Sequence, residues 1–476
     1  MLIGGEWRQA TAHQELEVVN PATEETVDSV PAGAVEDVEL AVATAKRAFT
    51  DWSKTDIEDR AAILAKAASL IAEHSRDLAA TLTAEQGKPL AEAAGEVTHL
   101  AHGVRYYAEA ATKVRGSYQQ LPSTFGPAYG LVIRRPMGVC AAITPYNFPL
   151  TLLGTKVAPA LASGNTVVAK PAATTPLATL AVARLFAEAG VPDGVLNVVT
   201  GRGSAIGDAL VGHPDVRRVA FTGSTAVGRH VVSVAGPELK RVTVELGGSD
   251  PVIICADADV DAAVKAVIIG RYWNAGQACL GCKRVFVHDS VYDDFVGQLV
   301  ERVGRYEPGD GTVKAEKPKL RMGPIHTRAG RDELLEQLES SGGEVLIGGG
   351  TGGHERGYFL EPAVVAEPAE DSRLMREEVF GPVLPVARFS DFDDALRRAN
   401  DTPYGLGSSI WTHDSRLIHR AAQEIDAGMT WVNQIHYGYD ELPFGGVKAS
   451  GFGKEHGLEA LDSYVELKSV VVGGLS

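Results

Sequence analysis

The sequence predicts an α/β protein with two doubly wound, three-layer domains and an additional β-arm for oligomerisation. Three observations support this class. Between residues 138 and 246, short apolar runs alternate with helical segments, as in a mostly parallel sheet covered on both faces. The same alternation restarts near residue 247. Two β-rich stretches, at 116–134 and 462–472, belong to neither series. Such strands need a partner edge, which a subunit interface provides.

The first series begins after an Ala-rich helical region at 37–112. Segments of this series end at a turn at 163–165 and at Gly190 with Pro192. The predicted helix has apolar residues at helical spacing and covers 177–188. The predicted strands are short apolar runs, at 138–143, 166–169, 195–199, 218–221 and 241–246.

The second series has predicted strands at 251–254, 284–287, 382–389 and 408–411, and a helix at 260–269. The Gly-rich segment 342–357 and the Pro/Lys segment 308–324 are predicted to be surface loops. We therefore assign 1–115 with 135–246 to a dinucleotide-binding domain and 247–440 to a catalytic domain. The remaining residues, 116–134 and 441–476, are assigned to an oligomerisation arm and C-terminal segment.

The composition is that of a folded protein, with 45% hydrophobic and 22% charged residues. A formal charge of −16 argues against a nucleic-acid partner, which would need a basic surface. The sequence contains no run of about 18 uncharged apolar residues, so no membrane span is predicted. The first residues do not resemble a secretory signal, and only four cysteines occur, which favours a reducing cytoplasm.

Three side chains stand where catalytic groups are often found. Cys279 follows Gly276, whose flexibility permits a sharp turn before the next strand. Glu245 ends an apolar run at the edge of the predicted sheet, and Asn147 follows another strand in a Pro-bracketed loop. Taken singly, each residue has an ordinary interpretation: a core cysteine, a solvated glutamate and a turn asparagine.

Two further features suit a phosphate-bearing cofactor. The segment 221–228 runs from a strand end through Gly223 and Ser224 into a helix, where backbone N–H groups can face a pyrophosphate. It is a weak signal, because it is not the Gly-x-Gly-x-x-Gly fingerprint. Lys170 follows a buried strand at the same sheet edge, although a lysine in isolation is more often a surface residue.

Taken together, these segments resemble the aldehyde dehydrogenase superfamily from Ile3 nearly to the C-terminus. Any one of them is modest evidence, but seven in this order and at this spacing are specific. They are 144–149, 167–171, 221–228, 245–248, 274–279, 377–382 and 443–446 with Lys448 and Gly451.

The resemblance implies oxidation of an aldehyde to its carboxylic acid with a nicotinamide dinucleotide as hydride acceptor. Cys279 would attack the aldehyde carbon as a thiolate, and Asn147 with the backbone N–H of Cys279 would hold the resulting alkoxide. Loss of hydride would leave a thioester, which water activated by Glu245 would hydrolyse. Lys156 matches a lysine that relays the proton in family members.

The resemblance also implies the cofactor contacts. In relatives that prefer NAD, a glutamate often stands three residues after the lysine, where this chain has Ala173. Without that carboxylate a 2′-phosphate is not repelled, so NADP is slightly favoured, with NAD use left open. The residues matching cofactor-binding positions are Thr144, Lys170, Ala173, Gly203, Gly207, Gly223, Ser224, Glu378 and Phe380.

The substrate is less defined. Relatives that oxidise succinate semialdehyde often present two arginines, and this chain has Thr155 and Trp273 at those positions. A semialdehyde stays the leading substrate; hydroxyaldehydes such as lactaldehyde and glyceraldehyde, or an aromatic aldehyde, stay open. The expected substrate pocket includes Trp273, with His436 and Tyr437 from a loop at 433–440.

Several alternatives also stay open. A CoA-acylating enzyme is disfavoured by Glu245, because water activated by Glu245 would waste the thioester. A catalytically inactive member is disfavoured by the intact candidate residues.

Arg271, in the helix before Cys279, is expected to face solvent. Cys282 is expected to be structural, with a reversible disulfide to Cys279 as the alternative; no metal site is expected. A homodimer or homotetramer is expected.

Overall fold

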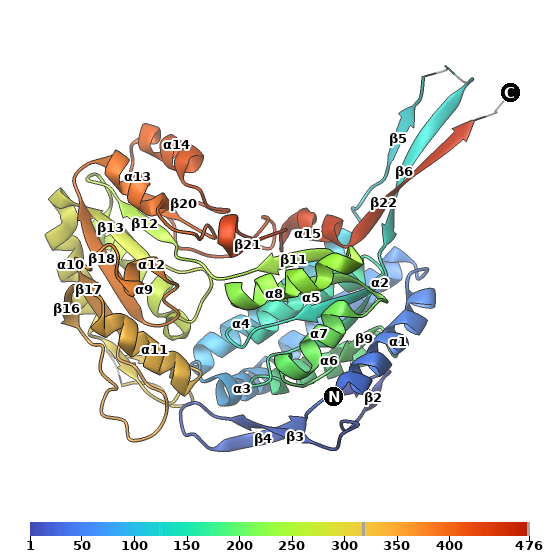
Figure 1. Ribbon diagram of the computed structural model, residues 1–476, viewed down its shortest axis with the longest axis horizontal. Coiled ribbons are helices and arrows are strands. Elements are labelled where there is room, and N and C mark those ends of the chain that lie inside the picture. The colour runs from blue at the N-terminus through green and yellow to red at the C-terminus, as the bar shows by residue number, and fades with distance from the viewer. Residues whose placement is uncertain (123, 125, 317–318, 474–476) are drawn as a thin grey trace.

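The computed structural model describes residues 1–473 apart from 123, 125, 317 and 318. Two helix-flanked sheets make up the body, and a narrow three-stranded sheet projects from it at one end (Figure 1). The predicted α/β class, with two layered units and a β-arm, is confirmed.

The first sheet has eight strands in the order β2-β1-β9-β8-β7-β10-β11-β21. Its five central strands are parallel, and β1 and β21 add antiparallel edges. The bounds are β1 Leu2–Ile3, β2 Glu6–Trp7, β7 Val139–Ile143, β8 Thr166–Lys170, β9 Leu196–Val198, β10 Val216–Thr222, β11 Arg241–Glu245 and β21 Gly451–Phe452. The connecting helices are α5 Pro149–Ala162, α6 Leu177–Ala189, α7 Gly203–Gly212 and α8 Thr225–Ala235, with η1 Gly236–Glu238.

Alternate residues of these strands enter two different cores. Val167 in β8 packs with Val157 of α5 in one hydrophobic cluster. Its neighbour Val168 packs with Val42 of α1 (Val35–Trp52) in another. Because successive strand side chains point to opposite faces, a strand buried on both faces reads as an unbroken apolar run. This is why the sequence located the central strands so closely.

The N-terminal helices are α1 Val35–Trp52, α2 Ile57–Glu73, α3 Ser75–Gln86 and α4 Leu90–Ala111, which confirms the helical region. Helix α4 packs against α2 and α5, so it lies beside the sheet (Figure 1). Before α1, β3 Glu15–Val19 and β4 Thr26–Pro31 form a separate hairpin.

The second sheet has seven strands in the order β16-β17-β18-β13-β12-β19-β20, all parallel except β16. The bounds are β12 Pro251–Ile254, β13 Arg284–His288, β16 Glu344–Ile347, β17 Ala363–Ala366, β18 Val383–Phe389, β19 Ser409–Trp411 and β20 Trp431–Val432. The helices are α9 Val260–Tyr272, η2 Trp273–Gly276, α10 Asp289–Val303, α11 Arg328–Glu339, α12 Arg373–Arg376, α13 Phe392–Asn400 and α14 Ser415–Glu424. After β20 come η3 Lys448–Ser450, α15 Gly457–Ser463 and β22 Val465–Gly473.

Two predicted loops contain strands. The segment 342–357 includes β16, an antiparallel edge strand with a register shift between Val345 and Ile347. The segment 308–324 overlaps β14 Tyr306–Pro308 and contains β15 Leu320–Met322, which pair with each other, while residues 317–318 lie outside the described residues. The loop predictions hold for the described residues between these strands but miss the strands themselves, which are short and partly exposed and so carry no strong apolar period.

The arm consists of β5 Ser117–Gln120, β6 Ala128–Pro136 and β22 Val465–Gly473, with β6 in the middle. Large apolar side chains are exposed on it, including Tyr118, Leu467 and Val471, each about two-thirds accessible. Two strand edges are also open in this sheet. These features are what a subunit contact requires, although the contact itself stays a prediction. In the part of the chain that the structure describes, no helix is both long and apolar enough to cross a membrane.

Candidate active site

The candidate site lies between the two sheet-containing units, and residues from both line it. In the first sheet, β7 and β10 are neighbours, and the crossover helices depart from them in opposite directions. The crevice beyond the carboxyl ends of such strands is where open α/β sheets bind ligands. Asn147 follows β7, Gly223 follows β10, and Glu245 ends β11. Cys279 comes from the other unit, in the loop that leads into β13.

The loop before Cys279 has an unusual backbone. Asn274, Ala275 and Gly276 all have positive φ, at 50°, 52° and 73°. A Cβ on Gly276 would lie 2.3 Å from the carbonyl oxygen of Gly381, so this turn requires glycine. The prediction that Gly276 permits a sharp turn is confirmed. The turn leaves Cys279 partly accessible.

Glu245 is buried and faces the Cys279 thiol. Burial, reinforced by the charge of Glu455, raises the pKa of Glu245 to about 8 despite the opposing effect of Lys156. Within the described residues, neither carboxylate oxygen accepts a hydrogen bond. A carboxylate with a pKa near neutrality and free lone pairs can take a proton from a thiol or from water.

The surroundings of Cys279 disfavour its thiolate. Burial, followed by the charge of Glu245, raises the pKa of Cys279 well above its usual value. Since the thiolate is the nucleophile, this thiol needs a neighbouring base before it can react. Glu245 is in position to be that base.

Asn147 lies against the Cys279 loop. Its side-chain NH₂ donates to the carbonyl of Gln277 at 3.0 Å, and its side-chain oxygen has no partner among the described residues. An amide NH₂ has two protons, so one N–H is left for another acceptor. The Asn147 side chain is therefore held in place and can still donate one further hydrogen bond.

Lys156 is fully buried and joins a network that the sequence did not reveal. Its ammonium donates to Glu455 at 2.6 Å and to Thr222 at 2.7 Å, and Thr155 donates to the other oxygen of Glu455 at 2.7 Å. Glu455 was missed because its partners lie some 300 positions earlier in the chain. The surrounding segment, with Lys454 and two nearby glycines, reads as a solvated loop.

Two cavities meet at Cys279. The first, of about 460 Å³, lies on the side of Gly223, Ser224, Glu378 and Phe380. The second, of about 240 Å³, extends to the other side of the same cysteine. Cys279 is therefore accessible from two directions at once, as a nucleophile between a cofactor and a substrate would have to be.

The structure brings only some of the predicted cofactor residues to the first cavity. Gly223, Ser224, Glu378 and Phe380 line it, with Glu245 and Cys279. The others lie along the same sheet edge but outside this cavity: Thr144 and Lys170 at the ends of β7 and β8, Ala173 just beyond, and Gly203 and Gly207 in α7. A Cβ on Gly203 or Gly207 would meet no atom within 4 Å, so α7 presents an open surface there. These positions fit an extended dinucleotide lying across the edge.

The second cavity contains the three predicted substrate residues Trp273, His436 and Tyr437. The sequence missed Phe148 and Phe444, which also line it; the Phe148 ring is 5.2 Å from that of Trp273. Among the described residues lining this cavity there is no lysine or arginine. Neither ring nitrogen of the buried His436 has a hydrogen-bond partner among the residues that the structure describes.

The basic residues near Cys279 hold the backbone. The expectation that Arg271 faces solvent is wrong, because Arg271 is buried and donates to the carbonyl of Val379 at 3.1 Å. Its partner comes from a distant segment, which the periodicity of α9 could not show. Lys283 donates to the carbonyls of Ala278 and Val379, and Arg284 to that of Ser249.

Cys282 is also buried and lies against α9. A Cβ on Gly270 would approach its sulfur to 2.7 Å. Burial raises the pKa of Cys282 to about 12, so its thiol is unreactive in this state. Both Cys279 and Cys282 are free thiols here, and the disulfide alternative stays a hypothesis.

Comparison with known proteins gives a consistent result. The aldehyde dehydrogenase family pattern matches residues 7–470. Phenylacetaldehyde dehydrogenase of Pseudomonas fluorescens is 42% identical, over 99% of this chain and 95% of the relative. An NADP⁺-dependent succinate-semialdehyde dehydrogenase of Escherichia coli is 37% identical, over 99% of this chain and 97% of that protein. The solved structure of PnpE from Pseudomonas sp. WBC-3, in complex with nicotinamide adenine dinucleotide, superposes with a TM-score of 0.96 at 39% identity, covering 100% and 97% of the two chains.

Proposed function

The chain belongs to the aldehyde dehydrogenase family and catalyses NAD(P)-dependent aldehyde oxidation, and on that premise we propose that Cys279 is its nucleophile. The observation that carries the proposal is the position of Cys279 where the two cavities meet, with Glu245 facing its thiol. An aldehyde in the second cavity can then be attacked by the sulfur, giving a thiohemiacetal.

Glu245 and Asn147 assist that attack. Glu245 accepts the thiol proton before the attack and later a proton from the water that hydrolyses the thioester. The free N–H of Asn147, with the backbone N–H of Cys279, donates to the oxygen that gains negative charge. Lys156 is paired with Glu455, and its positive charge acts on Glu245. It provides a route for the proton to leave Glu245.

A bound nicotinamide dinucleotide would accept the hydride in this reaction. Gly223 and Ser224 would hold its pyrophosphate, with Glu378 and Phe380 beside the nicotinamide end. Thr144, Lys170, Ala173, Gly203 and Gly207 would contact the adenosine end.

We favour NADP slightly over NAD. Position 173 has no carboxylate to repel a 2′-phosphate, and Lys170 stands at the end of β8 on the same edge. Burial lowers the pKa of Lys170 to about 8, so an arriving phosphate would stabilise its charged form.

For the substrate, the second cavity favours an aldehyde with a mainly apolar, aryl or alkyl body. Phe148, Trp273 and Phe444 surround it, and an unpaired carboxylate would be costly to bury there because no lysine or arginine from the described chain lines it. A semialdehyde or hydroxyaldehyde is the second candidate, favoured by the buried imidazole of His436, whose ring nitrogens have no hydrogen-bond partner among the described residues and whose Nδ1 lies 3.5 Å from the Asp250 carboxylate.

The larger assembly follows from the arm. We infer a homodimer or homotetramer in which the open edges of β5 or β22 pair with another copy.

We retain the proposed division into 1–115 with 135–246, 247–440, and 116–134 with 441–476, although β21 from the last segment joins the first sheet. The cytoplasmic location also stays a proposal, for which the four free thiols are the support.

The proposal is tested with a Cys279→Ala variant and a substrate panel. Cys279→Ala is expected to abolish turnover and keep dinucleotide binding; wild-type turnover in this variant would contradict the mechanism. The panel contains phenylacetaldehyde, butanal, succinate semialdehyde, lactaldehyde and glyceraldehyde, each with NAD and NADP, followed by absorbance of the reduced cofactor. Phenylacetaldehyde and butanal are expected to give a higher kcat/KM than succinate semialdehyde. Product formation that requires CoA would instead support the acylating alternative.

A further inference from the structure

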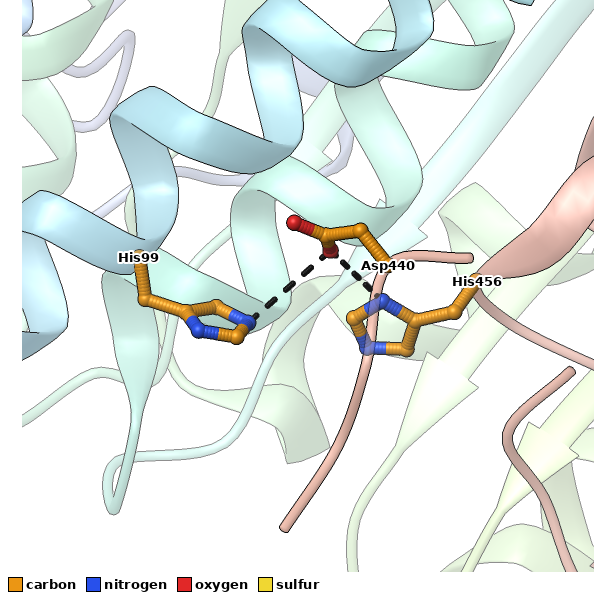
Figure 2. A group of neighbouring side chains, drawn as sticks. All are labelled: His99, Asp440 and His456. Atoms are coloured by element: carbon orange, nitrogen blue, oxygen red, sulfur yellow. Dashed lines mark hydrogen bonds and ion pairs between the residues drawn. The ribbon is translucent and has the colours of Figure 1, made fainter. Parts of the chain in front are cut away.

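Behind the second cavity, three side chains from distant parts of the chain converge on one point. His99 comes from α4, Asp440 from the loop after β20, and His456 from the residue before α15 (Figure 2). Their ligand atoms, two imidazole nitrogens and a carboxylate oxygen, all lie within 4.8 Å of one another. The Asp440 carboxylate is buried, as is the His456 ring.

From this geometry we propose that His99, Asp440 and His456 form a binding site for a divalent transition metal, with zinc as the best fit. Two imidazoles and one carboxylate are a donor set that suits zinc, which takes nitrogen and oxygen ligands in tetrahedral geometry. The fourth position would be filled by water.

The distances are compatible with one ion. With bonds of about 2.0–2.2 Å, neighbouring ligand atoms on tetrahedral zinc lie about 3.4 Å apart. Here Asp440 Oδ1 is 2.9 Å from His456 Nδ1 and 3.9 Å from His99 Nε2, values on either side of that separation. The longer distance is beyond a hydrogen bond, yet His99 Nε2 points toward the same oxygen (Figure 2).

The surrounding groups hold the ligands in the orientation that a metal needs. His99 Nδ1 is 3.0 Å from the hydroxyl of Tyr437, which leaves Nε2 as the nitrogen facing Asp440. His102 Nδ1 lies 2.6 Å from Asp440 Oδ2, which leaves Oδ1 for the ion. Such outer contacts fix ring orientation and tautomer in known metal sites.

An ion can reach the site from outside. A surface cavity is lined by His99, His102, Tyr437 and Asp440. On the inner side, His99 and His456 also line the second cavity. A bound ion would therefore join α4, the loop carrying Asp440 and the segment before α15 in the wall of that cavity. Metal binding itself does not depend on the proposed function.

The site is tested by metal binding to the full-length, chelator-treated protein. Zinc is titrated against a chromophoric chelator, and Co²⁺ is added separately to record the visible absorption of tetrahedral cobalt. We expect one equivalent of zinc per chain, and cobalt absorption without the near-ultraviolet band of thiolate ligation. A protein that binds no zinc, or whose cobalt spectrum shows thiolate ligation alone, overturns the proposal.

Variants separate this site from other ligands. His99→Gln, whose side chain is partly accessible, is expected to weaken zinc binding at least 100-fold, and His102→Gln about 10- to 100-fold. His230→Gln is the matched control, because His230 pairs with Asp208 at 2.8 Å on the surface without a third ligand. Its zinc affinity should equal that of the wild type, and Cys279→Ser should keep the one-to-one stoichiometry. Equal affinity in His99→Gln and wild type, or loss of binding only in Cys279→Ser, contradicts the proposal, even if the enzyme oxidises aldehydes as proposed.

Discussion

The buried ammonium of Lys88 donates to the backbone carbonyl of Asn147 at 2.7 Å and is paired with Glu96. Glu96 in turn accepts from the backbone N–H groups of Leu150 and Thr151 at the start of α5. The loop carrying the proposed oxyanion donor is thus fixed from both sides by one buried ion pair.

This relationship predicts a loss of both stability and turnover in Lys88→Met. Removing one partner leaves a buried, uncompensated carboxylate, which costs about 3–5 kcal/mol. The melting temperature should therefore fall, and kcat should fall because Asn147 is less firmly held. In Lys88→Met with Glu96→Gln, the melting temperature should largely recover while kcat stays low. Full recovery of kcat would show that Lys88 does not position Asn147.

Replacing Glu245 by Gln should slow both halves of the reaction. Without its base, thioester hydrolysis should slow by about 10²- to 10⁴-fold. Because Glu245 also accepts the thiol proton, formation of reduced cofactor should slow as well, without a fast burst of one equivalent. The exposed Glu238, replaced by Gln, is the control and should turn over normally. Wild-type turnover in Glu245→Gln would remove Glu245 from the mechanism.

The rate should depend on pH through Glu245. Its pKa is raised to about 8, and only the ionised carboxylate can act as a base. Consequently kcat/KM should fall as pH decreases below about 8 and level off above it. A plot of kcat/KM against pH for the wild type and Glu245→Gln tests this. A profile unchanged by the substitution would assign the titration to another group.

Asn147→Ala should lower kcat by about 10²- to 10³-fold, the usual cost of removing one oxyanion donor. Dinucleotide binding, measured by fluorescence titration, should be nearly unchanged, because Asn147 lines the first cavity but is not one of the proposed cofactor contacts. An equal loss in kcat and in dinucleotide affinity would mean that the substitution disturbs the loop as a whole.

Ala173→Glu should shift the cofactor preference toward NAD. A carboxylate near a 2′-phosphate is repulsive, and tenfold discrimination needs only about 1.4 kcal/mol. The ratio of kcat/KM with NADP to that with NAD should fall at least tenfold. Ala172→Glu, one residue earlier, is the matched control and should change the ratio less. An unchanged ratio in Ala173→Glu would place the adenosine ribose elsewhere.

The sequence could predict what depends on local patterns. The central strands are fully buried apolar runs, so their positions were nearly correct. Glu245 stands in a short motif at the end of a strand, Asn147 in one just after a strand, and Cys279 in one before a strand. It could not predict contacts made across the fold. Glu455 meets Lys156, and Arg271 meets Val379, only after distant segments pack together. The edge strand β16 was missed because its exposed side chains resemble those of a loop.

The pairing of β21 with β11 has a consequence for synthesis of the protein. Val244 and Phe452 face each other in register, but the ribosome makes Phe452 long after Val244. Until then, the edge of β11 has no neighbour on that side, and Lys156 has no Glu455 to neutralise its charge. The nascent chain therefore emerges with an open strand edge and a lysine whose counter-ion has yet to be translated, a period in which chaperone protection would matter most.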